Sequence, residues 1–164
     1  MRRARLAAVA VAAATATSLF PAAADAATID RPFAANSGDS CPYGVTAGTL
    51  GWSFGPGTSP LPPNGVTVTG RLTDHPTPVD PSTACRNDGY SSTVTFTAYT
   101  TTGEVARTSR TADNANVSFS FTIGGPTSTV HVGRIVVQVC RNPVVTTPPS
   151  YCGPAVTYLP PPVA

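Results

Sequence analysis

The stretch STVTFTAY, residues 92–99, indicates the fold class, because from Thr93 onward its side chains alternate between hydroxyl-bearing and apolar positions. Successive side chains of a β-strand point to opposite faces of the sheet, so this run has one apolar face and one polar face. The apolar face holds Val94, Phe96 and Ala98, and the other holds Thr93, Thr95, Thr97 and Tyr99. Such a run, rich in Thr, Val and Phe, is typical of a half-buried strand in an antiparallel sheet.

The same period of two recurs along the chain. GVTVTGRL (65–72) and NVSFSFTI (116–123) alternate in the same way, and their apolar faces hold Val66, Val68, Gly70 and Leu72, and Val117, Phe119, Phe121 and Ile123. VGRIVVQVC (132–140) is more continuously apolar and predicts a central strand. Weaker strands are predicted at 46–54, 104–110 and 155–159. No run has the period of an amphipathic helix, so we expect an all-β protein.

About seven short strands, separated by Pro- and Gly-rich turns, predict a single small antiparallel β-sandwich of immunoglobulin-like proportions. A small β-barrel is the alternative. We expect this domain to span residues 46–164 and residues 27–45 to form a loosely held N-terminal arm. The Cys-Trp-Cys spacing of true immunoglobulin domains is missing, because Trp52 follows Cys41 by only eleven residues. We expect Trp52 and Phe54 to pack in the core or at an edge.

Residues 1–26 have the three parts of a secretory signal peptide: arginines, an Ala-rich apolar run, and small residues that end at Ala24-Asp25-Ala26. The apolar run is shorter than the roughly 20 residues that a membrane span needs, so we expect cleavage after Ala26 and secretion. An Ala-rich signal and the absence of lysine are typical of an exported protein from a GC-rich bacterium.

Export changes the charge of the protein. Three of the ten arginines and one of the eight acidic residues lie within residues 1–26, which leaves seven charges of each sign. A basic patch, which nucleic-acid and anionic-membrane binding require, is therefore not indicated by the net charge. We expect neither nucleic acid nor membrane as a partner after signal cleavage, and we expect a monomer.

Four cysteines in an exported chain indicate two disulfides. We favour Cys140 with Cys152, because this pair flanks a Pro-rich turn between two predicted strands, and then Cys41 with Cys85 by elimination. Metal binding is the rival interpretation, but there is no C-x-x-C pair, and only His75 and His131 could assist the cysteines. We predict no metal and no cofactor.

The tripeptide Gly38-Asp39-Ser40 resembles the nucleophile block of the GDSL esterase and lipase family. The resemblance implies a nucleophilic serine at Ser40 at the end of a buried strand in an α/β fold. Cys41 replaces the usual leucine of that block, and the preceding RPFAANS does not have the pattern of a buried strand. The family's Asp-x-x-His block is absent, since Ser128 stands three residues before His131. We therefore predict that Ser40 and Asp39 are turn residues and that Ser40 is not catalytic.

Other acidic and histidine residues could carry chemistry. Asp74 and His75 are adjacent at a strand end, where neighbouring side chains point to opposite faces, so a hydrogen-bonded pair needs an irregular turn. Glu104 is the only glutamate, which excludes a glycosidase pair of two glutamates. A calcium site is conceivable from oxygen ligands, although their spacing matches no calcium loop; these are Asp74, Asp80, Asn87 and Asp88.

Two loops are the candidate functional surfaces. Residues 73–90 separate two strands by about eighteen residues, and loops of this length are commonly functional or disordered. Residues 141–151 would be enclosed by the bridge between Cys140 and Cys152, whose alternative role is only to fasten the C-terminal strand. The predicted binding residues are Arg141, Val144, Val145 and Tyr151, with Asp74, His75 and Asp80 from the first loop.

The sequence favours a secreted, noncatalytic binding module that presents Pro-rich loops on a disulfide-linked β scaffold. Its partner would be an extracellular protein or a polysaccharide. Two alternatives remain: a small secreted hydrolase that uses Asp and His of residues 73–90, and a structural protein of the cell envelope. This ranking depends on the scaffold and on the lack of a convincing catalytic constellation.

Overall fold

The computed structural model describes residues 27–55, 63–81, 85–125, 131–145 and 149–162. The predicted signal peptide, residues 1–26, lies outside the described residues. The described part of the chain contains nine strands and no helix. None of these residues belongs to a helix with the length and hydropathy of a membrane span.

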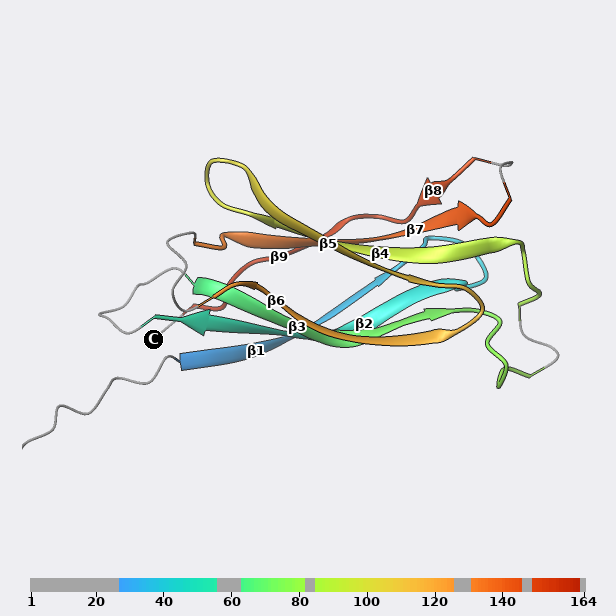
Figure 1. Cartoon of the computed structure of the whole chain (residues 1–164), viewed down its shortest axis with the longest axis horizontal. Coiled ribbons are helices and arrows are strands. Elements are labelled where there is room, and N and C mark those ends of the chain that lie inside the picture. The colour runs from blue at the N-terminus through green and yellow to red at the C-terminus, as the bar shows by residue number, and fades with distance from the viewer. Residues whose placement is uncertain (1–26, 56–62, 82–84, 126–130, 146–148, 163–164) are drawn as a thin grey trace, which may run out of the picture.

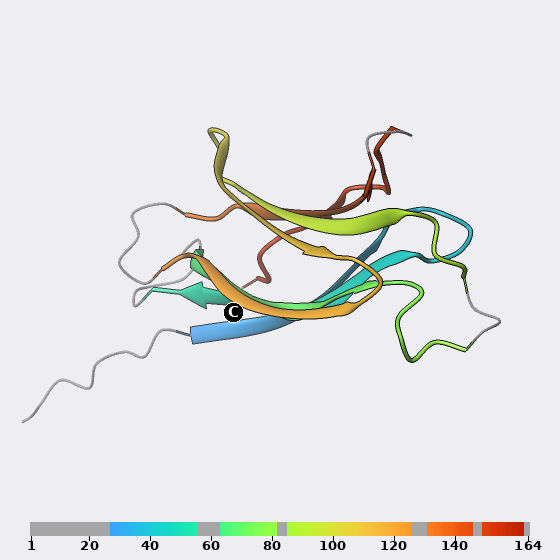
Figure 2. The ribbon, with the colours of Figure 1, turned by 45° about the vertical axis from the view of Figure 1, so that its right-hand side comes forward.

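The strands form two antiparallel sheets, which make two layers in Figure 1 and, from a second direction, in Figure 2. Sheet A has the order β1-β2-β3-β6, and sheet B has the order β5-β4-β7-β8, with β9 also paired to β7. The bounds of sheet A are β1 (Ala27–Asn36), β2 (Gly44–Phe54), β3 (Pro63–Asp74) and β6 (Asn116–Gly124). Those of sheet B are β4 (Tyr90–Tyr99), β5 (Glu104–Ala112), β7 (Arg134–Pro143), β8 (Tyr151–Cys152) and β9 (Val156–Tyr158).

The chain passes between the sheets three times. It runs through β1, β2 and β3 in sheet A, crosses to β4 and β5 in sheet B, and returns to sheet A so that β6 pairs with β3. It then crosses again, and β7 pairs with β4. Each predicted strand overlaps an observed one, and β7 is central, as the continuously apolar run 132–140 predicts.

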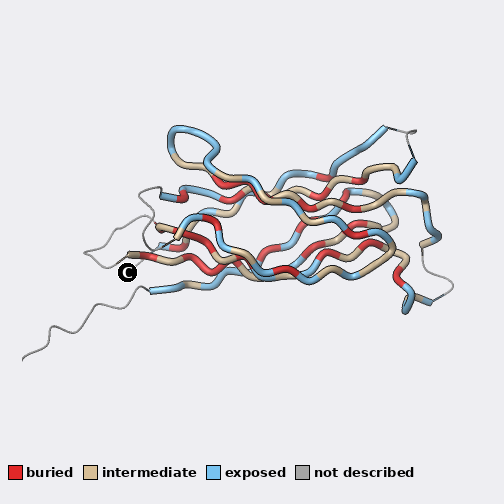
Figure 3. The backbone as a smooth tube through the Cα atoms, viewed as in Figure 1, coloured by how far each residue is buried: buried red, intermediate tan, exposed pale blue. Residues whose placement is uncertain are grey.

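The hydrophobic core lies between the two layers, where the buried segments of Figure 3 face one another. The apolar faces predicted from the alternation point inward: Val66, Val68, Leu72, Val94, Phe96 and Ala98 are all fully buried. Trp52 and Phe54 also belong to this core. The phenyl rings of Phe33 in sheet A and Phe96 in sheet B meet edge to face, with centroids 5.3 Å apart. The period of two therefore predicted most of the buried faces, although Val117 and Phe121 are only partly buried and Thr97 of the polar face is buried.

The prediction of a loosely held arm at residues 27–45 is wrong for most of that segment. Ala27–Asn36 forms β1, which pairs with β2 over its whole length. Phe33 and Ala35 are buried, and Phe33 lies opposite Gly48 in the register. A Cβ atom at Gly48 would come within 2.8 Å of the Phe33 ring, so the glycine leaves the space that the ring occupies. The alternation in β1 was obscured because Asp30, Arg31 and Pro32 interrupt the apolar positions.

Candidate functional site

Both candidate loops lie at one end of the molecule, the right-hand end in Figure 1. The connections β1–β2, β3–β4 and β7–β8 meet there with the short turn between β5 and β6. The disulfide Cys41–Cys85 joins the first two connections, and Cys140–Cys152 joins directly opposite residues of β7 and β8. The favoured cysteine pairing is thus the one that the structure has. We refer to this region as the loop end.

A buried ionic cluster lies beneath these loops. We call Arg141, Asp74, Ser92 and Asp88 the Arg141 cluster. Arg141 of β7 and Ser92 of β4 are register partners in sheet B, whereas Asp74 is the last residue of β3 in sheet A. The guanidinium of Arg141 donates to Asp74 Oδ1, to Ser92 Oγ at 2.6 Å and to Asp88 Oδ1 at 2.6 Å. The cluster therefore connects the two sheets with the β3–β4 connection.

Each carboxylate of the cluster has further donors or lies near the protein surface. The Ser92 hydroxyl donates to Asp74 Oδ1 at 2.6 Å, and the backbone N–H of Asn114 donates to Asp74 Oδ2 at 2.8 Å. Arg141 and Asp74 are fully buried, whereas Asp88 retains 20% of its side-chain exposure. Burial of a charge is tolerated only when it is paired and hydrogen-bonded. This arrangement meets that condition for both carboxylates, and it fixes the turn that contains Asn114.

Aromatic rings cover the Arg141 guanidinium. Its central carbon lies 5.1 Å from the ring centroid of Tyr43 and 5.9 Å from that of Tyr90, both within cation–π range. A Cβ atom at Gly44, the residue after Tyr43, would lie 2.5 Å from Ser92 Oγ. Glycine at this position therefore allows β2 to approach the cluster.

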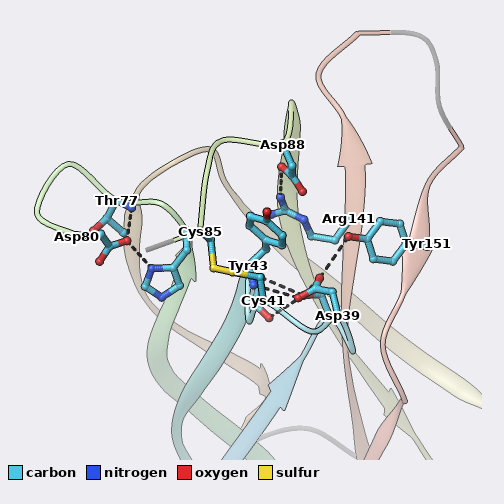
Figure 4. Close-up of a disulfide and its surroundings, with 12 residues drawn as sticks. Asp39, Cys41, Tyr43, Thr77, Asp80, Cys85, Asp88, Arg141 and Tyr151 are labelled. Atoms are coloured by element: carbon cyan, nitrogen blue, oxygen red, sulfur yellow. Dashed lines mark hydrogen bonds and ion pairs between the residues drawn. A yellow bond between two sulfur atoms is a disulfide. The ribbon is translucent and has the colours of Figure 1, made fainter. Parts of the chain in front are cut away.

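The burial of Arg141 contradicts the prediction that it is an exposed binding residue. The side chain is fully buried and forms ion pairs with Asp74 and Asp88. Figure 4 shows it directed toward Asp88. The physical reason is the alternation itself. Arg141 is in phase with the inward residues Ile135, Val137 and Val139 of the same strand.

A second hydrogen-bonded group surrounds Asp39. Its carboxylate accepts hydrogen bonds from the Ser37 hydroxyl at 2.7 Å, the Tyr43 N–H at 3.1 Å and the Tyr151 hydroxyl at 3.2 Å. Partial burial, and after it the negative charge of Asp39, raise the pKa of the Tyr151 phenol above its ordinary value. Tyr151 also packs edge-on against Tyr90, with centroids 5.6 Å apart. Asp39 thus holds β8 against the β1–β2 connection, as Figure 4 shows.

His75 and Asp80 form a third group at the start of the β3–β4 connection. His75 Nδ1 lies 2.6 Å from Asp80 Oδ2, which also accepts the Thr77 N–H at 2.5 Å. The contact with His75, followed by the bond from Thr77, lowers the pKa of Asp80 below its ordinary value. Asp74 and His75 do not pair with each other, in agreement with the expectation from their adjacent positions on a strand end.

The remaining predicted residues lie on the surface. Val144 is 58% and Val145 is 69% exposed, and Tyr151 is partly exposed. The N–H of Val144 donates to the carbonyl of Gly89 at 2.9 Å, so the two candidate loops are in direct contact. Val79 of the β3–β4 connection is also exposed. Among the described residues, six large hydrophobic side chains are exposed, and four of them therefore lie at the loop end; the other two are Val105 and Leu159.

Among the residues that the structure describes, no nucleophile lies beside a base. Ser40 is exposed, and the described contacts place no histidine against its hydroxyl. Asp39, which the esterase resemblance would place beside a nucleophile, instead accepts two hydrogen bonds from its own loop and one from Tyr151 of β8. Ser92 is fully buried and donates to Asp74. No group of three or more His, Cys, Asp or Glu among the described residues could hold a metal ion.

Four members of these groups were not predicted from the sequence: Ser92, Asp88, Asp39 and Tyr43. The sequence did contain a pattern that predicts the buried members of the Arg141 cluster. Asp74, Ser92 and Arg141 occupy the inward phase of their strands, where the other inward positions are apolar. A polar residue in the inward phase of each of three strands predicts a shared buried contact, since such groups must be paired. The loop partners Asp39 and Asp88 have no periodicity and gave no such signal.

A separate hollow lies on the outer face of sheet A. Its volume is about 750 Å³, and its lining includes Thr69, Arg71, Thr73, Ser118 and Ser120. The side chains that line it are mostly small and polar, and its one aromatic residue, Phe119, belongs to the buried core.

Comparisons of this chain with protein-family models, with curated proteins and with solved structures found no match.

Proposed function

We propose that this chain is an extracellular, noncatalytic binding module whose loop end recognises a protein partner. The scaffold in this proposal is a β-sandwich of immunoglobulin-like type. Its support is the connectivity: β3 and β4 lie in opposite sheets, β6 returns to β3, and β7 returns to β4. Paired crossings of this kind are typical of Greek-key sandwiches. Two disulfides are compatible with an oxidising compartment.

The main support for the proposal is that exposed apolar side chains lie directly beside a rigid part of the structure. Val144 and Val145 project from the β7–β8 connection, directly beyond the buried Arg141 and the bridge Cys140–Cys152. A surface that is ordered before binding loses less conformational entropy when a partner docks. Exposed apolar groups on ordered loops contribute to a protein interface when they become desolvated.

A polysaccharide partner is less well supported. Flat glycan chains commonly stack on exposed aromatic rings, and the tyrosines here are engaged elsewhere. Tyr43 and Tyr90 lie near Arg141, Tyr99 packs under Arg134, and the Tyr158 hydroxyl bonds to the backbone of Ala34. Tyr151 packs against Tyr90 and donates to Asp39. The structure therefore favours apolar contacts at the loop end over a row of aromatic rings.

The hydrolase alternative needs a nucleophile or an activated water beside the His75–Asp80 pair. That pair has the geometry of a base and its orienting carboxylate. Among the described contacts, no hydroxyl or thiol approaches His75. The alternative of a structural cell-envelope protein is based on the high Thr and Pro content of the sequence. It requires that the protein attach to cell-wall material.

The test begins with capture. The oxidised protein is immobilised and exposed to fractionated culture supernatant and to cell-wall material of the source organism, and the retained molecules are identified. Affinity for the retained protein is then measured for a variant with Val144→Ser and Val145→Ser. We expect at least about a tenfold loss, because burial of a valine side chain at an interface contributes roughly 1.5 kcal/mol or more, and about 1.4 kcal/mol corresponds to a factor of ten in affinity.

The matched control is Val105→Ser with Leu159→Ser, which changes the two exposed apolar residues that lie outside these loops. The control should bind as the unchanged protein does. Equal affinity of the loop variant and the unchanged protein would remove the loop end as the binding surface. Retention on wall glycan alone would favour the polysaccharide or envelope alternative.

A further inference from the structure

The four outer edges of the two sheets differ in how they are protected. An exposed edge strand presents unpaired N–H and C=O groups that can pair with a strand from another chain. Natural proteins block such edges with proline, charges, bulges, short strands or covering groups. In this protein the edges are formed by β1 and β6 in sheet A, and by β5 and the short β8 and β9 in sheet B.

The β1 edge is blocked by side chains. The Tyr158 hydroxyl accepts a hydrogen bond from the Ala34 N–H at 2.9 Å and donates one to the Ala34 carbonyl at 2.7 Å. Both backbone groups of this residue are therefore satisfied by a side chain from β9. Pro32 has no N–H to offer to a further strand, and Asp30 and Arg31 add charges.

The edges of sheet B are blocked in other ways. The β5 strand carries Glu104, Arg107 and Arg110, and the register with β4 shifts between Ala98 and Tyr99. Arg107 and Glu104 form an exposed ion pair at 2.8 Å. The β8 and β9 strands have only two and three residues, which is too short to guide a long added strand.

The β6 edge lacks proline, charges of its own and register shifts, and its one described covering contact is the Arg110 guanidinium of β5, 4.9 Å from the Phe121 ring centroid. Its nine residues, Asn116–Gly124, include no proline and no charged side chain. It pairs with β3 without a register shift, and no described strand covers its other side. Its sequence is rich in Val, Phe, Ile, Ser and Thr and has no net charge, which is the composition that favours strand addition.

The order of side chains in β6 indicates which kind of strand pairs with its free edge. The sequence VSFSFTI, residues 117–123, is nearly symmetric about Ser120. If a second copy of β6 runs antiparallel with Ser120 opposite Ser120, then Ser118 faces Thr122, Phe119 faces Phe121 and Val117 faces Ile123. Directly opposite residues share a face of the sheet, so hydroxyls meet hydroxyls and apolar groups meet apolar groups. A closed two-fold interface requires this self-complementarity.

We propose that two copies of this chain associate through antiparallel β6–β6 pairing centred on Ser120, which joins their A sheets into one continuous sheet. On the outer face, pairs of hydroxyls already connect β3 and β6, as in Thr67 with Thr122 and Thr69 with Ser120, each at 3.3 Å. The second copy continues these hydroxyl rows. On the inner face, the half-buried Phe121 gains a phenyl ring, Phe119 of the second copy, beside the Arg110 guanidinium that already covers it.

This interface leaves the loop end free. The Asn116 end of β6 lies at the loop end, because Asn116 pairs with Thr73 beside Asp74. Antiparallel pairing therefore directs the two loop ends in opposite directions. The interface does not depend on what the loop end binds.

The test uses charges on the outer face of β6. The unchanged, oxidised protein is examined by sedimentation over a range of concentrations and is expected to show a monomer–dimer equilibrium. The double variant Ser118→Lys with Thr122→Lys places like charges directly opposite each other across the two-fold axis. We expect its dimerisation to weaken by at least about tenfold, since each like-charged cross-strand pair is destabilising.

A charge-swap experiment separates loss of pairing from loss of folding. The variant Ser118→Glu with Thr122→Glu is also expected to be monomeric alone, but an equimolar mixture of the lysine and glutamate variants should form heterodimers. The matched control, Thr28→Lys with Ala34→Lys, changes outward residues of the protected β1 edge and should dimerise as the unchanged protein does. A monomeric unchanged protein at submillimolar concentration, or dimerisation that the β6 charges do not affect, would overturn the proposal.

Discussion

The centre of the molecule and its loop end are both packed between the same two sheets, yet they are held together by different interactions. At the centre, inward residues such as Val68, Phe96 and Ile135 form an apolar core. At the loop end, the inward positions of the same strands are occupied by Asp74, Ser92 and Arg141. The strand period places both sets inside, so the side chains alone decide whether the interior is apolar or ionic.

The two regions therefore respond differently to substitution. An apolar core tolerates changes of shape and loses stability gradually with lost volume. A buried ionic cluster causes a large loss of stability when a single partner is removed, because another charge is then left buried without compensation. Directional hydrogen bonds also restrict geometry, so the cluster can fix the positions of the loops that it connects.

The largest effect is expected for Arg141→Ala. This change leaves Asp74 fully buried without its cation, and it removes the link to Asp88. We expect the free energy of unfolding to fall by about 3–5 kcal/mol, the range for one partner lost from a buried pair. Chemical denaturation followed by tryptophan fluorescence measures this, since the chain has a single, buried Trp52.

The control for this prediction replaces both charges, as Arg141→Met with Asp74→Leu. No buried charge then remains between these two positions, so the loss of stability should be smaller than for Arg141→Ala alone. An equal or larger loss in the double variant would show that the ion pair itself, rather than the uncompensated carboxylate, accounts for the effect.

The next largest loss of stability is expected when the disulfide that closes the β7–β8 connection is removed. In the variant Cys140→Ser with Cys152→Ser, a closed loop with a sequence separation of 12 is opened. The chain-entropy model gives a loss of about 3 kcal/mol for a loop of this size. Thermal unfolding under non-reducing conditions measures it, with the unchanged protein as reference. A variant as stable as the reference would show that the bridge contributes little beyond the hydrogen bonds of Asp39 and Arg141.

A smaller effect is expected in the apolar core. Ile135→Val removes one methyl group from a fully buried position on the strand that also carries Arg141. The expected loss is about 1 kcal/mol, typical of this change in a well-packed core. The same denaturation experiment gives the value. A loss as large as that of Arg141→Ala would contradict the proposed difference between the two regions.

The comparison also shows what the sequence could predict. Alternation predicted the strands and their buried faces, because half-buried antiparallel strands impose a period of two. The β1 strand was missed because Asp30, Arg31 and Pro32 hide its pattern, although Phe33 and Ala35 are buried in phase. Arg141 was assigned to the surface because its position next to Cys140 was interpreted as the start of a loop. Its partner Asp88 comes from a connection without periodicity, so their contact required the folded structure.

The smallest expected effect is a change of protein stability with pH, which arises from the His75–Asp80 pair at the edge of the loop end. The contact of Asp80 with His75, followed by the Thr77 N–H, lowers the pKa of Asp80 in the folded protein. A lowered folded pKa contributes stability above the unfolded pKa of about 3.9, and this contribution is lost as the pH falls from there through the folded value.

His75→Phe removes the largest cause of the lowered pKa, so the pKa of Asp80 should rise toward its ordinary value. His75→Gln, which keeps a neutral donor, should raise it less. A carboxyl-resolved NMR titration measures this, with the exposed and distant His131→Phe as a control that should leave Asp80 unchanged. If His75→Phe left the titration of Asp80 unaltered, the Thr77 backbone would be the dominant partner, and the His75–Asp80 contact would have no measurable role at the loop end.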